Sequence, residues 1–152
     1  LFFILLSKNN LLVARFKTSI TAFFFLMASN YTFIYDGECP FCNHFAELLE
    51  IKSKIPRLTV IDGRKNLNII NSLLDKGFDL DKGAVLIKGD DIFHGAEAIN
   101  TICKEVENPS SRLLQLLSVT FKSTKRTKFL FPLLIRARRL ALISKGVSTS
   151  LV

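Results

Sequence analysis

The 152-residue sequence has no tryptophan, a single methionine at Met27 and only three cysteines, Cys39, Cys42 and Cys103. So few cysteines exclude a small secreted scaffold that is held together by several disulfides. In such a chain, a Cys-x-x-Cys pair indicates a catalytic or metal-binding site instead. We therefore expect a reducing, cytoplasmic compartment.

Long apolar runs are also missing from the first 29 residues. The runs 1–6 and 20–26 are apolar, but Lys8, Arg15 and Lys17 lie between them. Neither run reaches the roughly 20 residues that span a bilayer. The charges follow the first run, whereas a signal peptide carries them before it. We interpret residues 1–29 as a leader whose first 26 residues lie upstream of a true start at Met27, with a membrane-touching leader as the alternative.

Acidic residues are absent from both ends of the chain. All thirteen lie within residues 30–107, while residues 108–152 hold nine Lys or Arg. The net charge of +8 therefore belongs to the flanks, and one flank is expected to meet an anionic surface. The sequence contains no nucleic-acid reader motif, so we expect no nucleic-acid partner.

The stretch most suited to chemistry is Asp36-Gly37-Glu38-Cys39-Pro40-Phe41-Cys42. A β-rich run, 31–35, precedes it, and residues 43–54 follow with apolar residues at helical spacing. Asp36-Gly37 is a turn pair, and Pro40 suits the first position of a helix, where no N–H is needed. A strand, a tight turn and a Cys-Pro-x-Cys at a helix start predict a dithiol redox site.

The remaining pattern predicts the fold class. A strand is expected at 58–61, a helix from 67 with Gly77 as its C-terminal cap, a hairpin at 84–93 and a helix from 96. This β-α-β-α-β-β-α order predicts a three-layer α/β fold of thioredoxin-like type. Its central mixed sheet should have about four strands flanked by helices, with parallel, buried middle strand pairs. We divide the rest into a redox domain at 30–108, a basic amphipathic helical extension at 109–147 and a loose tail at 148–152.

The unpaired N–H groups at a helix start favour a thiolate. We therefore expect Cys39 to be the exposed nucleophile and the less accessible Cys42 to resolve the mixed disulfide. Asp36 would raise the pKa of Cys39 if its charge were close. The same carboxylate could instead accept a proton from Cys42, cap the helix or simply form the turn.

Two other functions stay open at this point. A metal site would need further ligands, and the candidates are Cys103, His44 and His94, so the ligand count falls short of the four that zinc takes. The pair could also be a redox switch, without turnover, in a thioredoxin-like binding or membrane-surface module. We expect no cofactor beyond the Cys39–Cys42 pair and no metal.

The Asp-Gly-x-Cys-x-x-Cys stretch resembles the signature of the DCC family of thiol–disulfide oxidoreductases. Further likenesses cover most of residues 31–145, namely Asp62-Gly-Arg64, Leu80-Asp-Lys-Gly83, His94-Gly-Ala-Glu-Ala-Ile99 and Phe131-Pro-Leu-Leu134 with its following arginines. The resemblance implies a thioredoxin-like fold and dithiol–disulfide chemistry through Cys39 and Cys42. Supporting roles would fall to Asp36, Gly37, Pro40 and Arg64.

The sequence departs from ordinary thioredoxins at one point. Lys82-Gly83-Ala84 stands before the expected third strand, where those proteins have a proline. A cis-proline clamp for substrate peptides should therefore be absent. Arg64 either places positive charge near the thiolate or is a solvated loop residue.

Residues 112–145 combine apolar and basic residues in helical spacing. They could lie on an anionic membrane, contact an acidic protein or pack on the domain with their arginines in water. We expect a monomer whose substrate is a protein or small-molecule thiol or disulfide.

Overall fold

The computed structural model describes residues 30–151, so the predicted leader and the proposed start at Met27 lie outside the described residues. Within them the elements follow the predicted order. The first strand, β1 (Tyr31–Tyr35), leads through a turn into α2 (Pro40–Lys52), and β2 (Leu58–Asp62) leads through the short 3-10 turn η1 (Gly63–Lys65) into α3 (Leu67–Asp75). The α/β, thioredoxin-like fold class is confirmed.

The sheet has the strand order β2-β1-β3-β4. β1 pairs in parallel with β2 and antiparallel with β3 (Val85–Lys88), which forms a hairpin with β4 (Asp91–His94). The sheet is mixed as predicted, but the expectation of parallel pairing in its middle was wrong. After α3, the 3-10 turn η2 (Leu80–Lys82) brings the chain back at the end of the sheet where β1 finishes, so β3 runs the opposite way.

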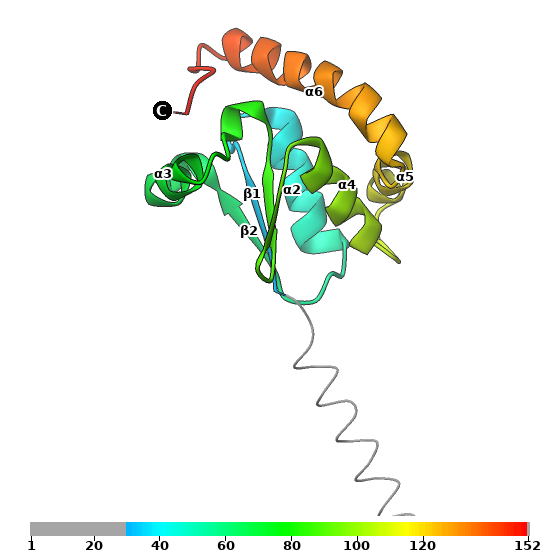
Figure 1. The fold of residues 1–152 in the computed structure, drawn as a ribbon. Helices are drawn as coiled ribbons and strands as arrows, with labels where there is room; N and C mark the ends of the chain where they lie inside the picture. Colours follow the sequence, from blue (N-terminus) through cyan, green and yellow to red (C-terminus); the bar gives the residue numbers. More distant parts are fainter. Residues whose placement is uncertain (1–29, 152) are drawn as a thin grey trace, which may run out of the picture.

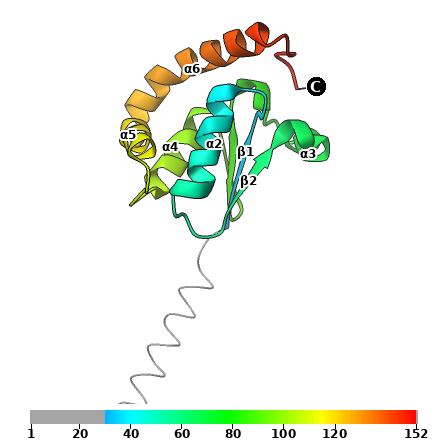
Figure 2. The same ribbon diagram turned by 180° about the vertical axis from the view of Figure 1, so that it is seen from behind.

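Two apolar layers bury β1 on both faces. Tyr31, Phe33 and Tyr35 point toward α2 and α4 (Ala96–Glu105), whereas Ile34 packs with α3 on the other face. Figures 1 and 2 show α3 on one side of the sheet and α2 and α4 on the other. Burial on both faces explains why this strand shows no alternation of apolar and polar residues.

The C-terminal extension forms α5 (Arg112–Phe121) and α6 (Thr124–Ser144). α6 arches over the end of the sheet where α2 begins (Figures 1 and 2). The buried amide of Asn100 on α4 donates hydrogen bonds to the carbonyls of Phe121 and Lys122, at 2.7 and 2.9 Å, and so fixes the junction between the two helices. No helix among residues 30–151 has the length and apolarity needed to cross a membrane.

The end of the chain packs against the domain, although we expected a loose tail at 148–152. The carbonyl of Ser148 accepts a hydrogen bond from Arg64 at 2.8 Å. The backbone N–H of Leu151 donates to the Asp81 carboxylate at 3.1 Å, and the Ser150 hydroxyl donates to the same carboxylate at 3.0 Å. The Leu151 side chain packs against the core on the α3 side of the sheet. These contacts hold residues 148–151 beside α3 and η2.

Candidate redox site

The two cysteines meet at the first turn of α2. Cys39 is the N-cap residue, and its Sγ accepts a hydrogen bond from the backbone N–H of Cys42 at 3.2 Å. Pro40 occupies the first turn of the helix, as predicted. Both thiols are free in the structure.

The expected order of exposure was wrong. Cys39 is 0% exposed, whereas Cys42 is only partly buried. The reason is geometric, because the side chain of Cys39 turns back to meet the N–H of Cys42 instead of pointing into solvent. Cys39 lines the cavity beside the dithiol, so a substrate sulfur would approach it from there.

Hydrogen bonding shifts the pKa values of the two thiols in opposite directions. The side-chain hydrogen bond from Cys42 is the largest influence on Cys39 and, with backbone N–H groups of the first turn, lowers its pKa to about 7 against the effects of burial and of Asp36. The same hydrogen bond, together with burial and the neighbouring sulfur charge, raises the pKa of Cys42 strongly. At neutral pH the pair can thus hold one thiolate, on Cys39, and one thiol, on Cys42.

Asp36 is a buried carboxylate between two arginines. Arg64 donates to it from Nε at 2.6 Å and from Nη2 at 3.2 Å. Arg138 donates from Nε at 3.0 Å and from Nη2 at 2.7 Å. Burial alone would raise the pKa of Asp36, but the hydrogen bonds from the two arginines outweigh it and hold the pKa below its ordinary value. A carboxylate held in this way is a poor proton acceptor for Cys42.

The Asp36-Gly37 turn and the Asp62-Gly-Arg64 segment bind each other. The Asp62 carboxylate accepts the backbone N–H groups of Gly37 and Arg64, at 3.1 and 3.0 Å, while Arg64 reaches back to Asp36. A β-carbon at position 37 would collide with the Asp62 carboxylate, so glycine is required there by close approach. The reading of Arg64 as a solvated loop residue was wrong, since its side chain is largely buried and bound to Asp36. Its role as a positive charge near the thiolate stays a prediction.

Arg138 and Asp81 are the two site residues that the sequence analysis missed. Arg138 lies on α6 with only 4% of its surface exposed and donates to the Asp81 carbonyl at 3.0 Å as well as to Asp36. A helical projection offers the missed signal, because Arg138 falls on the same side as the inward-facing Thr127, Phe131 and Leu142. We had grouped it with the solvent-facing arginines.

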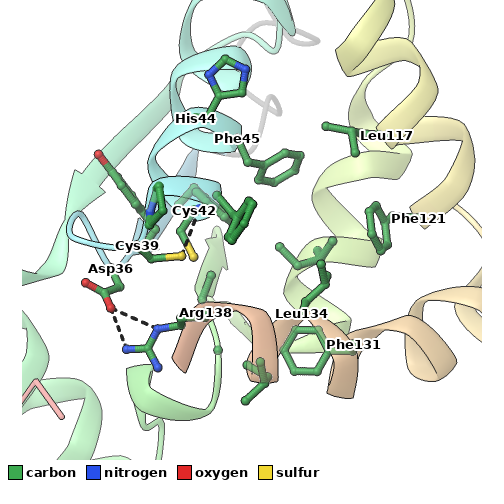
Figure 3. A pocket seen from close by; sticks show the side chains of 18 of the residues that line it. Asp36, Cys39, Cys42, His44, Phe45, Leu117, Phe121, Phe131, Leu134 and Arg138 are labelled. Carbon is green, nitrogen blue, oxygen red and sulfur yellow. Dashed lines mark hydrogen bonds and ion pairs between the residues drawn. The ribbon is translucent and has the colours of Figure 1, made fainter. Parts of the chain in front are cut away.

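A cavity of about 540 Å³ lies beside the dithiol, and its lining is almost wholly apolar. Cys39 and Cys42 stand at one side of it. Figure 3 shows Phe45 on α2, Leu117 and Phe121 on α5, and Phe131 and Leu134 on α6 around the space. The C-terminal extension therefore supplies a wall of the site.

Gly83 lies shortly before β3, in the stretch Lys82-Gly83-Ala84, which has no proline. It has a φ of +146°, and a β-carbon there would collide with Gly95 and with the Phe131 ring. No cis peptide bond occurs within residues 30–151. The positive φ and the close approach of the Gly95 backbone and the Phe131 ring together require glycine at this position.

The possible metal ligands are not brought together. Cys103 is fully buried in the core, as expected, and burial raises its pKa to about 12. His94 bonds through Nε2 to the Asp79 carbonyl at 2.7 Å, and the side chain of His44 is 62% exposed on α2. Among the described residues, no three His, Cys, Asp or Glu side chains gather in a way that could hold a metal ion.

One protein family matches this chain. The family model described as DCC1-like thiol-disulfide oxidoreductase aligns with residues 33–143. The aligned region contains both cysteines, Asp36, Arg64 and Arg138. No curated protein and no solved structure matches the chain.

Proposed function

The chain belongs to the DCC1-like thiol-disulfide oxidoreductase family, and from this premise we propose that it exchanges electrons with a substrate through Cys39 and Cys42. The observation that carries the proposal is the arrangement at the start of α2. There, the Sγ of Cys39 accepts the N–H of Cys42 at 3.2 Å, and the two thiols are driven toward opposite protonation states.

The proposed reaction proceeds in two displacements. The Cys39 thiolate attacks one sulfur of a substrate disulfide, which forms a mixed disulfide and releases one substrate thiolate. Cys42 then loses its proton and attacks the Sγ of Cys39, which forms the Cys39–Cys42 disulfide and releases the second thiolate. Two electrons pass from the protein to the substrate. The same steps in reverse oxidise a dithiol.

The negative charge on Asp36 is not needed as a proton acceptor in this scheme. Its depressed pKa and its four hydrogen bonds from arginines support a positioning role, in which it ties the turn before Cys39 to η1 and to α6. Arg138 opposes the rise in the pKa of Cys42 through its charge, whereas Asp36 contributes to that rise. The two residues therefore act in opposite directions on the pKa of the resolving thiol.

The test compares turnover of a chromogenic disulfide by the wild type and by Cys39→Ser, with a small dithiol as the final reductant. We expect the substitution to abolish turnover, because serine cannot form the mixed disulfide. Cys103→Ala is the matched control and should keep most of the activity, since Cys103 lies in the core away from the site. Turnover that persists in Cys39→Ser would end the assignment.

A second function, a module that acts at a membrane surface, is favoured by the outward face of α6. Phe129, Leu133, Leu140 and Ile143 are 62–83% exposed along this face, and Arg136 and Arg139 lie among them. Residues 108–152 contain no acid that would repel anionic headgroups. We propose that this face, defined by these six residues, contacts an anionic lipid surface. The cytoplasmic compartment stays a prediction.

Turnover distinguishes an oxidoreductase from a membrane-surface module whose dithiol is only a redox switch. A redox switch would form the Cys39–Cys42 disulfide reversibly but would not turn over a substrate. An oxidoreductase that works at a membrane would show both turnover and lipid binding.

A further inference from the structure

We propose that the substrate of this dithiol is a small, uncharged, apolar disulfide, or the corresponding thiols in the reverse direction, bound in the cavity beside Cys39 and Cys42. The inference rests on the proposed function and names the substrate class of the same site. Three properties of the cavity carry it, namely its size, the state of its charged groups and the backbone around Gly83.

The size of the cavity fits a small molecule. Its volume of about 540 Å³ lies within the range of roughly 300 to 1,000 Å³ that is usual for small-ligand sites. Its mouth carries apolar side chains that are partly open to solvent, with Phe41 60%, Leu113 45% and Leu134 39% exposed. An apolar molecule that covers these groups gains the free energy of removing their surface from water.

The charged side chains in the cavity lining are already paired with other residues of the protein. Among the described residues that line the cavity, the charged side chains are Asp36 and Arg138, and they bond to each other at 2.7 Å. Arg138 also binds Asp81, and Asp36 also binds Arg64. The remaining titratable lining residue besides the two cysteines and Tyr35 is His44, whose side chain is 62% exposed. A charged substrate such as oxidised glutathione would have to place its carboxylates against apolar walls, which is costly.

An extended polypeptide also fits poorly. A substrate peptide that adds as a strand needs free backbone groups before β3. Here the N–H of Gly83 donates to the Leu80 carbonyl at 3.2 Å, and the carbonyl of Ala84 accepts the N–H of Gly95 at 2.8 Å. The Phe131 ring of α6 lies close against Gly83 and Gly95. α6 therefore covers the segment before β3 that a peptide would use.

The experiment mixes the fully reduced protein with a limiting disulfide in a single turnover and follows the loss of protein thiols. The probes are dipropyl disulfide, its dicarboxylate analogue dithiodipropionate, oxidised glutathione and insulin. Each rate is divided by the rate of the same disulfide with dithiothreitol, which removes differences in intrinsic reactivity. We expect the normalised rate to be highest for dipropyl disulfide, by about tenfold or more.

Two leucines of the C-terminal extension give a matched pair of variants. Leu134→Gln places a polar group in the cavity wall and should lower the normalised rate with dipropyl disulfide by roughly threefold to tenfold. Leu116→Gln makes the same change at a residue of α5 that is 65% exposed and does not line the cavity, and it should leave the rate unchanged.

The substrate class would be overturned by charged disulfides or insulin that react as fast as dipropyl disulfide, or by equal effects of the two glutamine variants. Those results would contradict the substrate class but not the proposed dithiol chemistry. The proposed function itself would fail, and the substrate class with it, if Cys39→Ser were oxidised at the wild-type rate or if the wild type reacted with none of the four disulfides.

Discussion

Cys39 is the residue at which opposing electrostatic effects meet. The first turn of α2 and the thiol of Cys42 stabilise its thiolate, while burial and the charge of Asp36 oppose it. The opposing charge is largely neutralised where it arises, because Arg64 and Arg138 both bond to Asp36. The Asp36 carboxylate can therefore lie close to Cys39 while the pKa of the Cys39 thiol stays below its ordinary value.

The first prediction concerns this pKa. A group with a lowered pKa ionises earlier as pH rises, so the thiolate of Cys39 should appear with a midpoint of about 7. The measurement is ultraviolet absorbance of the thiolate against pH in the Cys103→Ala background. In Cys42→Ala the largest stabilising hydrogen bond is lost, and the midpoint should move upward. A wild-type midpoint near 8.5, the value of a free cysteine, would contradict the account.

The second prediction concerns Asp36. Asp36→Asn leaves Arg138 buried without its main counter-charge, and loss of one partner from a buried ion pair costs about 3 to 5 kcal/mol of unfolding free energy. Chemical denaturation near neutral pH should show a loss of this order. Lys65→Ala is the matched control, because Lys65 is 82% exposed in its ion pair with Asp62 and ion pairs of exposed lysines contribute about 0 to 1 kcal/mol.

The pH dependence of stability is a second test of the contribution of Asp36 to the free energy of unfolding. The folded pKa of Asp36 is below its unfolded value, so its contribution is full above the unfolded pKa and is lost as pH falls through the folded pKa. The wild type should therefore lose stability in acid more steeply than Asp36→Asn. Equal acid profiles would show that the carboxylate does not act as an ion-pair partner.

At the scale of elements, α6 has two working faces. Its inner face carries Phe131, Leu134 and Arg138 into the cavity and the ion-pair cluster, while its outer face holds exposed apolar side chains among arginines. Pro132 lies within the helix and removes one helical hydrogen bond, and the helix arches over the sheet end (Figure 1). One element thus serves both the redox site and the proposed membrane contact.

The third prediction tests the outer face. Co-sedimentation with anionic phospholipid vesicles at low salt should retain the wild type, and higher salt should weaken the binding by screening. Phe129→Glu should lower the vesicle affinity by roughly tenfold or more, because it removes an inserted ring and adds a repelled charge. Ile51→Glu is the control, since Ile51 is 68% exposed on α2, away from this face.

Absence of binding to anionic vesicles at low salt would remove the membrane contact. Equal losses in Phe129→Glu and Ile51→Glu would also contradict it. Binding to an acidic protein but not to vesicles would assign the same surface to another partner.

Much of the fold follows from local pattern, and much of the site does not. Strand β1, the start of α2 at Pro40 and the cap at Gly77, which has a φ of +85°, are set by short-range preferences that the sequence displays. The antiparallel pairing of β1 with β3 and the burial of Arg138 depend on contacts between residues far apart in the chain. Residue spacing can place Arg138 on the inward side of its helix, but it carries no information on which distant residue is its partner.

The cysteines illustrate the same limit within one motif. Their spacing and the helix start were evident, but their order of exposure was not. The direction in which the Cys39 side chain turns is decided by the N–H of Cys42 and by the covering cavity wall.

At the scale of the whole molecule, helices α5 and α6 of the C-terminal extension form part of the wall of the cavity beside the dithiol. Residues Leu114 and Phe121 belong to the main core, and the tail after α6 bonds to Arg64 and Asp81. The extension is therefore part of the domain and also part of the site. What reaches Cys39 is selected by α5 and α6 as much as by the motif itself.

The most direct test of the central claim is to map the mixed disulfide in Cys42→Ser. Without a resolving thiol, reaction with dipropyl disulfide should leave one propylthio group on Cys39, which mass spectrometry of proteolytic peptides locates and dithiothreitol removes. The double variant Cys39→Ser, Cys42→Ser should carry no such group. A group on Cys103, or none on Cys39, would contradict the assignment of Cys39 as the nucleophile.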